Sequence, residues 1–304
     1  MKTKTFYSNG KLLLTGEYAV LDGALSLAVP TTYGQSLTIE PIDEQQLIWT
    51  SFDENNAVWF QDVFEIIQDV MLKQVQHDET YNKLVQILNT AKQLNPDFLG
   101  ENKGFNVSTQ LTFPKNWGLG TSSTLINNIA SWAQVDAYSL LENTFGGSGY
   151  DIACAQHNYP ISYQINEYGR SVNQVRFHPS FSDHLYFVYL NKKQNSRDGI
   201  AMYRSQTKES KMFISEISDI TNKMIICESL NEFDKLITSH ENLIATQIKQ
   251  KPIKQLLFND FNGAVKSLGA WGGDFILATS NGNPKSYFET KGFKTVIPYR
   301  DMVL

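Results

Sequence analysis

A glycine turn that runs into an amphipathic segment, FPKNWGLGTSSTLINNIA over residues 113–130, most constrains how this chain can fold. Gly118 and Gly120 permit a tight turn and close approach of a ligand to the backbone. Three hydroxyl residues of the kind that begin helices follow: Thr121, Ser122 and Ser123. Apolar residues then recur with helical period: Leu125, Ile126, Ile129, Trp132 and Ala133. The segment therefore predicts a helix whose N–H groups and dipole favour an anion such as phosphate. An ordinary glycine turn with an N-cap explains the same residues equally well.

Two common nucleotide-binding signatures do not fit this segment. No GK[ST] ends it, which excludes a Walker loop, and the third glycine of a Rossmann fingerprint is missing. Three further glycine-containing segments occur elsewhere: GKLLLTGEYAVLDG at residues 10–23, GGSGYDIA at 146–153 and GAWGGD at 269–274. One such segment alone is a weak indication, but the four in this order are specific.

In this order, the four segments resemble the GHMP kinases, a family that includes galactokinase, homoserine kinase, mevalonate kinase and phosphomevalonate kinase. The resemblance implies a two-domain α+β fold with the active site in a cleft between the domains. It implies an N-terminal domain like the second domain of ribosomal protein S5 and a ferredoxin-like C-terminal domain. A polar, proline-containing stretch at residues 178–184 predicts the boundary, so we expect domains over 1–182 and 183–304.

Local patterns predict strands and helices that fit an α+β chain. Residues 80–94 place their apolar side chains on one helical face, and Pro96 follows the stop. Further helices are expected over 136–145, 211–230, 232–248 and 253–265. Strands are expected over 3–8, 11–14, 35–41, 46–51, 57–61, 105–111, 161–165, 173–177, 185–190, 275–279 and 293–298.

Asp151 and Lys11 are the expected catalytic residues. From its position alone, Asp151 is better explained as the cap of the helix that opens at Ile152 than as a catalytic residue. The resemblance favours catalysis, because the similar family segment holds an aspartate that faces the acceptor hydroxyl. Asp151 would then accept a proton or orient that hydroxyl. Lys11 matches a family lysine that pairs with the aspartate and steadies negative charge, whereas most lysines are simply solvated.

The resemblance also implies the ligands of ATP and magnesium. The ATP-binding residues would be Gly118, Leu119, Gly120, Thr121, Ser122 and Ser123. Ser122 matches the serine that touches Mg²⁺ in mevalonate kinase, and Glu142 is the nearest carboxylate before Asp151 for a second ligand. A helix-surface glutamate is the competing interpretation of Glu142, because mevalonate kinase has a longer segment between the loop and the aspartate.

The acceptor is expected to contact residues of the other glycine segments: Glu17, Tyr18, Gly149, Gly272 and Gly273. The order Gly-Glu-Tyr is closer to phosphomevalonate kinase, because mevalonate kinases usually have histidine where Tyr18 stands. Glu17 could instead hold its turn as a structural residue. Trp271 replaces a usual glycine, so its ring either narrows the pocket or packs against the loop. The basic stretch LNKKQNSRDG at residues 190–199 could contact an anionic substrate or could be a solvent-exposed turn.

Composition restricts the classes of partner and the cellular location that we expect for this protein. The chain has 304 residues, 41% of them hydrophobic, which allows two domains with a substantial core. A net charge of −5 lacks the excess positive charge that is typical of proteins that bind nucleic acid or an anionic membrane. The two cysteines, Cys154 and Cys227, form no zinc-type cluster, and no apolar signal core or long apolar segment is present. We therefore expect a cytoplasmic protein without nucleic-acid or membrane partners.

The function implied by the resemblance is transfer of the γ-phosphoryl of Mg-ATP to mevalonate or phosphomevalonate, in isoprenoid biosynthesis. A kinase for another small metabolite, such as a sugar or an amino alcohol, remains an alternative. A diphosphomevalonate decarboxylase is less favoured because its aspartate context is not seen. A non-catalytic nucleotide sensor of the same fold is the third alternative. Such sensors usually lose the lysine, the loop serine or the aspartate, whereas Lys11, Ser122 and Asp151 are all present.

Overall fold

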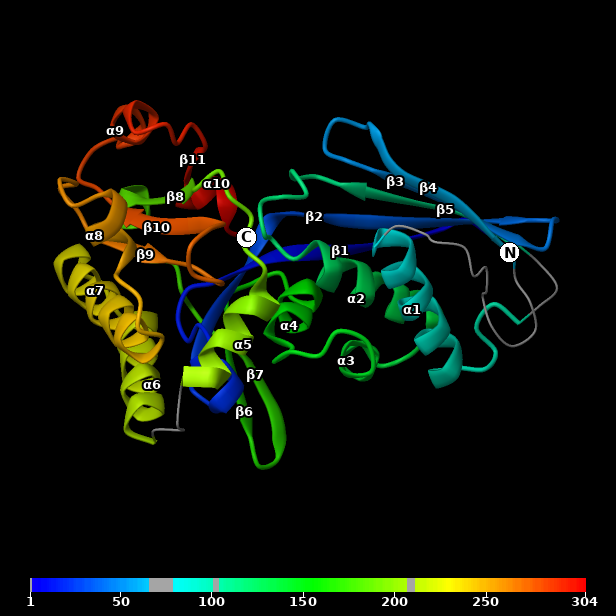
Figure 1. Ribbon diagram of the computed structural model, residues 1–304, viewed down its shortest axis with the longest axis horizontal. Helices are drawn as coiled ribbons and strands as arrows, with labels where there is room; N and C mark the ends of the chain where they lie inside the picture. Colours follow the sequence, from blue (N-terminus) through cyan, green and yellow to red (C-terminus); the bar gives the residue numbers. More distant parts are fainter. Residues whose placement is uncertain (1, 66–78, 101–103, 207–210) are drawn as a thin grey trace. The chain divides into compact units, whose positions relative to one another are not determined.

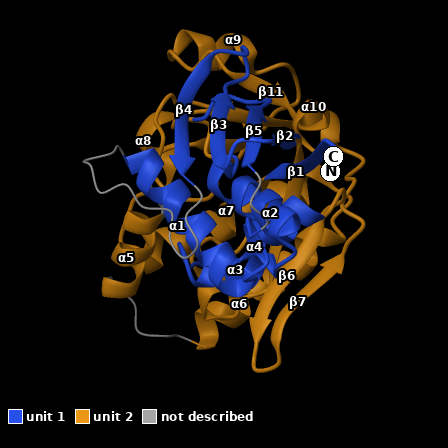
Figure 2. Ribbon diagram, turned by 90° about the vertical axis from the view of Figure 1, so that its right-hand side faces the viewer, with its two compact units in different colours: residues 1–10, 33–115, 119–156 blue, residues 11–32, 116–118, 157–304 orange. Residues whose placement is uncertain are grey.

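The computed structural model describes residues 2–65, 79–100, 104–206 and 211–304, and it is a mixed α+β chain (Figure 1). It divides into two compact units (Figure 2). The first unit comprises residues 1–10, 33–115 and 119–156, and the second comprises 11–32, 116–118 and 157–304. The sequence predicted a single boundary near residue 182. The units are not consecutive because strands β1 (Lys4–Leu13) and β2 (Ser26–Ile42) each contribute residues to both.

The sheet of the first unit has the order β4-β3-β5-β2, the last of these through residues 35–42. Its other strands are β3 (Gln46–Phe52), β4 (Val58–Glu65) and β5 (Gly104–Leu111). β3 pairs antiparallel with β4 and parallel with β5, and β5 pairs antiparallel with β2. The hairpin between β3 and β4 closes on Asp53, whose Oδ1 accepts the N–H groups of Asn55 and Ala57, both at 2.9 Å. The strands expected over 46–51, 57–61 and 105–111 are confirmed, each to within a few residues. The strand expected over 35–41 is also present, but β2 begins nine residues earlier, at Ser26.

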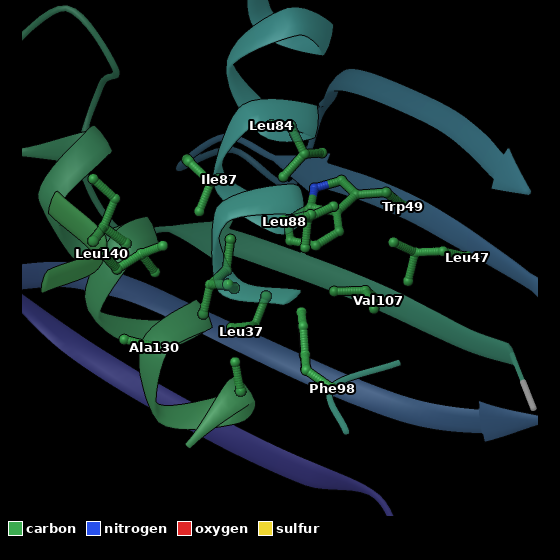
Figure 3. Packing of buried hydrophobic residues seen from close by; sticks show 14 of the residues in the cluster. Leu37, Leu47, Trp49, Leu84, Ile87, Leu88, Phe98, Val107, Ala130 and Leu140 are labelled. Atoms are coloured by element: carbon green, nitrogen blue, oxygen red, sulfur yellow. The ribbon is translucent and has the colours of Figure 1, made fainter. Parts of the chain in front are cut away.

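The described residues of the first unit also form the helices α1 (Glu79–Leu94), α2 (Thr121–Ala133), α3 (Ala137–Glu142) and α4 (Tyr150–Gln156). α1 matches the helix expected over 80–94. Figure 3 shows its Leu84 and Leu88 next to Trp49, which is 1% exposed, and Ile87 belongs to the same cluster. Alternation in the strands and helical periodicity in α1 thus supply the two faces of one hydrophobic core.

A second sheet, in the second unit, has the order β11-β8-β10-β9, with every neighbouring pair antiparallel. Its strands are β8 (Leu185–Tyr189), β9 (Val265–Ser267), β10 (Phe275–Thr279) and β11 (Val296–Pro298). The helices of this unit are α5 (Ser196–Gln206), α6 (Lys211–Ile225), α7 (Leu230–Gln247), α8 (Ile253–Leu257), α9 (Lys285–Thr290) and α10 (Tyr299–Met302). Short 3₁₀ turns cover Ala19–Asp22 (η1) and Ser182–His184 (η2).

A hairpin of β6 (Ile161–Asn166) and β7 (Gly169–Gln174) also belongs to the second unit, and β6 pairs with residues 26–28 of β2. None of the helices within the described residues combines the length and apolar character needed to cross a membrane.

Two local predictions in the second unit were wrong. The helix expected over 253–265 ends at Leu257, because the turn-forming residues of FNDFNG follow it. Conversely, the basic stretch at 190–199 opens helix α5, which the sequence analysis did not predict. The side chain of Asn195 accepts the N–H of Arg197 at 3.1 Å, so it acts as the cap that starts α5.

Candidate active site

The glycine turn leads directly into α2, and its last glycine is the N-cap of that helix. Gly120 has φ +97°, a left-handed conformation that residues with a Cβ rarely adopt. Because glycine has no side chain, no side-chain cap bonds the first N–H groups of α2 in the described structure. These N–H groups also lack partners within the helix. This geometry favours the anion-binding interpretation over an ordinary N-cap.

The hydroxyls that follow Gly120 differ in their surroundings. Ser123 is 3% exposed, and its Oγ donates to the carbonyl oxygen of Gly120 at 2.9 Å, so it braces the turn. Thr121 is half-buried and Ser122 is exposed. Leu119 is fully buried, so only its backbone could meet a nucleotide. Ser122 is therefore the hydroxyl best placed to meet a ligand.

Lys11 and Gly118 meet within the second unit. The Lys11 Nζ donates to the Gly118 carbonyl oxygen at 2.9 Å, which places an ammonium at the start of the glycine turn. The carboxyl of Asp274 packs against the other side of Gly118. A Cβ on Gly118 would come within 2.4 Å of that carboxyl, and Gly118 also has φ +71°. Both the backbone conformation and the close approach therefore require glycine at this position.

Asp274 is held in a left-handed conformation (φ +53°) by its neighbours. Its N–H donates to the Lys192 carbonyl oxygen at 2.7 Å, and its Oδ1 accepts the N–H of Gln194 at 3.1 Å. Burial raises the pKa of the Asp274 carboxyl, whereas the Gln194 N–H, Lys11 and Lys193 act in the opposite direction. The carboxyl is thus anchored beside Gly118 and within electrostatic reach of Lys11.

Asp151 lies in the first turn of α4, in the first unit. It is half-buried, and its Oδ1 accepts the N–H of Ile152 at 3.2 Å, a contact typical of a helix start. Gly149 precedes it with φ +88°. Lys11 belongs to the other unit, so the predicted pairing of Lys11 with Asp151 stays a prediction.

Glu17 lies inside the second unit rather than at a surface. It is 1% exposed, its Oε1 pairs with the ammonium of Lys266, and its Oε2 lies 3.5 Å from the Nε2 of His240. The same Nε2 accepts the N–H of Gly16 at 2.9 Å. Burial raises the pKa of Glu17 to about 7 against the opposing effect of Lys266. These contacts favour the structural alternative for Glu17.

Tyr18 is also enclosed, at 7% exposure with φ +60°. Its ring stacks on Tyr203 of α5 at a centroid separation of 5.4 Å, and its hydroxyl oxygen accepts the N–H of Trp271 at 3.1 Å. Gly199 of α5 lies so near that a Cβ there would come within 2.7 Å of the Tyr18 hydroxyl. Trp271 is 4% exposed and packs in the same cluster. Of the two expectations for Trp271, packing is the one that the structure supports.

Comparisons with known proteins were informative only at the level of structure. No protein-family model matches the sequence, and a search of curated proteins gave no match. The mevalonate kinase of Methanococcus jannaschii superposes with a TM-score of 0.71 at 14% identity, over 96% of this chain and 95% of that one. Streptococcus pneumoniae phosphomevalonate kinase, in complex with phosphomevalonate and AMPPNP, gives 0.71 at 15% identity over 95% and 97%. Lactococcus lactis galactokinase with galactose gives 0.66 at 12% over 95% and 88%.

The chain has the GHMP kinase fold. Each of these superpositions covers nearly the whole chain, so the α+β class and the family resemblance inferred from the four glycine segments are confirmed. The superpositions establish the fold, but sequence identities of 12–15% do not identify the substrate.

The metal ligands expected from the GHMP resemblance, Ser122 and Glu142, both stay predictions. Ser122 offers an exposed hydroxyl oxygen in the first turn of α2, which suits the hard-ligand preference of Mg²⁺. Glu142 is the last residue of α3 and is exposed. Within the part of the chain that is described, no group of three or more His, Cys, Asp or Glu residues could hold a metal. A site with one serine, one carboxylate, water and phosphate oxygens needs no such group, and Glu142 stays a prediction.

The structure adds three residues that the sequence analysis did not place near the GHMP segments: Lys266, His240 and Gln194. Lys266 is a lone lysine in a short strand, and His240 is one of five histidines scattered along the sequence. Their partners lie far away in the sequence, since Lys266 and Glu17 are 249 positions apart. For Lys266 and His240, the clearest sequence signal is the apolar residues of β9 and α7, which predict burial without naming a partner.

Proposed function

We propose that this chain is an ATP-dependent kinase that transfers the γ-phosphoryl of Mg-ATP to mevalonate or phosphomevalonate. The start of α2 carries the proposal: a glycine cap at φ +97° leaves the first N–H groups of α2 without a side-chain cap, and the exposed Ser122 stands beside them. Such a helix start is suited to nucleotide phosphates. Backbone N–H groups of Thr121, Ser122 and Ser123 would hold the phosphates of ATP.

The other groups of the site would act on the charge that moves during transfer. Lys11 would stabilise negative charge as the γ-phosphoryl leaves ADP. Asp151 would orient the acceptor and, for a hydroxyl acceptor, take its proton; an acceptor phosphate already carries an anionic oxygen and needs only orientation. Ser122 and a carboxylate, for which Glu142 is our candidate, would hold Mg²⁺. When bound, this ion neutralises phosphate charge.

The acceptor is inferred from the Gly-Glu-Tyr order at residues 16–18 and from Asp274 after the last glycine pair. Both are closer to phosphomevalonate kinase than to mevalonate kinase. The structural relatives include a protein complexed with phosphomevalonate and one complexed with galactose, so a sugar acceptor is the competing outcome.

ADP release with mevalonate, phosphomevalonate, homoserine and galactose tests this proposal. Transfer to mevalonate or phosphomevalonate supports the proposal. Transfer only to galactose or homoserine would show that the chain is a kinase with a different acceptor. Binding of ATP with no transfer to any acceptor identifies a sensor instead.

Two matched variants separate catalysis from helix capping. Asp151→Asn should reduce turnover by roughly 10²–10⁴-fold while ATP affinity stays near that of the unmodified protein. Asp136→Asn is the control, because Asp136 is the cap of α3 and accepts the N–H of Ser139 at 2.7 Å. Asparagine caps a helix nearly as well as aspartate. Equal turnover of the two variants would remove Asp151 from the mechanism.

A further inference from the structure

A line of polar side chains crosses the interior of the first unit and joins two strands to two helices. It comprises Ser8 of β1, Gln35 of β2, Asn127 and Asn128 of α2, and Gln156 of α4. Ser8 is fully buried, Gln35 and Asn128 are each 1% exposed, and Asn127 is 6% exposed. Only Gln156, at the end of the line, is exposed. Buried amides are costly unless they are bonded, so this line has to be satisfied from within.

Every link of the line is a hydrogen bond of good length. Gln156 Nε2 donates to Asn127 Oδ1 at 3.0 Å, and Asn127 Nδ2 donates to Ser8 Oγ at 2.9 Å. Ser8 Oγ donates to Asn128 Oδ1 at 2.7 Å, and Asn128 Nδ2 donates to the backbone carbonyl oxygen of Gln35 at 2.9 Å. The Gln35 side chain extends the connection, since its Oε1 accepts from Thr124 Oγ1 at 2.7 Å.

The direction of the line is fixed at its β2 end. The backbone oxygen of Gln35 can only accept, so Asn128 must turn its Nδ2 to it and its Oδ1 to Ser8. Ser8 has one hydrogen and gives it to Asn128, so it has to receive a hydrogen from Asn127. Asn127 Oδ1 is then left to accept from Gln156. Reversing any one amide would break its neighbours' bonds, which makes the line a single polarised unit.

The two helices that the line joins each carry a part of the proposed reaction centre. α2 begins at the glycine turn, and α4 carries Asp151 in its first turn. Both helices also bury apolar side chains in one cluster, among them Ile126, Ile129 and Ile152. Apolar contacts are non-directional and tolerate sliding and rotation, whereas Asn127 bonds α4 and β1 at defined angles.

We propose that Asn127 is a positioning residue that, through Gln156 and Ser8, fixes α4 and its Asp151 against the helix that begins at the glycine turn. This inference rests on the proposed kinase function. It assigns a role to two consecutive buried asparagines of α2, at positions where leucine or alanine would fill the space without orienting α4.

Asn127→Asp tests the direction of the line. An ionised carboxylate cannot donate to Ser8, whereas the protonated acid can. Turnover per nucleotide-binding site should therefore fall roughly tenfold at mildly alkaline pH, as expected for a small misplacement. It should recover towards that of the unmodified protein as the pH is lowered, with ATP affinity unchanged throughout. Asn82→Asp is the control, because Asn82 is exposed on α1 and gains the same charge outside the line.

Gln156→Met provides a second arm that leaves the interior intact, because Gln156 is exposed. It removes only the link to α4. Turnover per site should fall several-fold at unchanged ATP affinity, and amide hydrogen exchange over residues 150–156 should become faster while exchange in the interior of α2 does not. The Ala153 N–H, which donates to the Gly149 carbonyl oxygen at 3.1 Å, is a suitable marker.

The outcomes separate this inference from the proposed function. Loss of turnover per site in both variants, with low-pH recovery only in Asn127→Asp, supports the inference. Unchanged exchange over residues 150–156 and unchanged turnover in Gln156→Met overturn it, whether or not Asn127→Asp folds. If the unmodified protein transfers no phosphoryl group, the kinase proposal fails, and the exchange measurement still decides whether the line holds α4.

Discussion

Two glycine-containing turns of this molecule resemble each other in sequence but differ in whether their polar groups are exposed or bonded to distant residues. The turn at 118–123 ends in Gly120 at φ +97°, and the turn at 16–22 passes through Tyr18 at φ +60°; each then enters a helix without a side-chain cap. In the first turn Ser122 is exposed. In the second, Gly16 donates to His240, Glu17 pairs with Lys266 and the Tyr18 oxygen accepts from Trp271. The first turn thus leaves a hydroxyl exposed at the start of its helix, whereas the polar groups of the second turn are buried and contact residues from distant parts of the chain.

The largest expected effect concerns the internal pairing of the second turn. Lys266→Met should lower the free energy of unfolding by about 3–5 kcal/mol, because it leaves the carboxylates of Glu17 and Glu241 buried without their cation. Chemical denaturation measures this loss. The double variant Lys266→Met with Glu17→Gln is the control and should recover part of the stability. A loss below about 1 kcal/mol for Lys266→Met would show that the turn is open to water.

The pH dependence of stability should report the same turn. Burial raises the pKa of Glu17 from 4.5 to about 7, so its contribution to stability is complete below about pH 4.5 and is lost as the pH rises towards 7. The full loss is roughly 3 kcal/mol. His240 has a pKa lowered by burial and by Lys266, and it contributes the opposite slope below pH 6.5. The raised pKa of Glu241 adds a slope of the same sign as that of Glu17.

Glu17→Gln isolates this contribution, because the slopes of His240 and Glu241 are present in both proteins. The stability of the unmodified protein relative to the variant should fall between pH 4.5 and 7, as followed by urea unfolding at each pH. A difference that does not change with pH would contradict the buried carboxyl.

Gly120→Ala probes the first turn and should act on binding rather than on the fold. An alanine at φ +97° is strained by about 1–2 kcal/mol, so the turn would relax and ATP affinity should fall roughly tenfold or more. Titration calorimetry with ATP measures the change. Gly282→Ala is the control, because Gly282 has no positive φ and a Cβ there meets open space. Equal affinities in the two variants would remove the turn from the nucleotide site.

Tyr18→Phe gives the smallest effect and sharpens the contrast between the turns. It removes the acceptor of the Trp271 N–H and should cost about 1 kcal/mol of unfolding free energy, with the acceptor KM unchanged. Thermal unfolding and steady-state kinetics measure the two quantities. A raised KM at unchanged stability would instead place the Tyr18 hydroxyl on the acceptor, as the sequence predicts.

Local patterns in the sequence were enough to predict most of the elements and the glycine turn that begins α2. α1 was predicted from side chains that share one helical face, and the beginning of α2 from two glycines followed by hydroxyls. These signals lie within one helical turn or one strand repeat, so the sequence displays them directly. The order of four glycine segments along the chain also identified the fold, which the superpositions confirm.

Other features depend on partners that are far apart in the sequence. The sequence left both a substrate contact and a structural role open for Glu17; only the fold brings Lys266 and His240 to it and closes the turn against water. No local pattern explains why Asn127 and Asn128 are buried in α2, and their roles become clear only when β1, β2 and α4 supply hydrogen-bond partners.

The amino-acid sequence by itself determined most of the elements, the glycine turn and the fold, because backbone conformation and periodicity act over a few residues. Tertiary structure alone decided which polar groups are buried and which of them bond each other. Burial and hydrogen-bond direction arise only when distant segments pack together, so no local pattern records them.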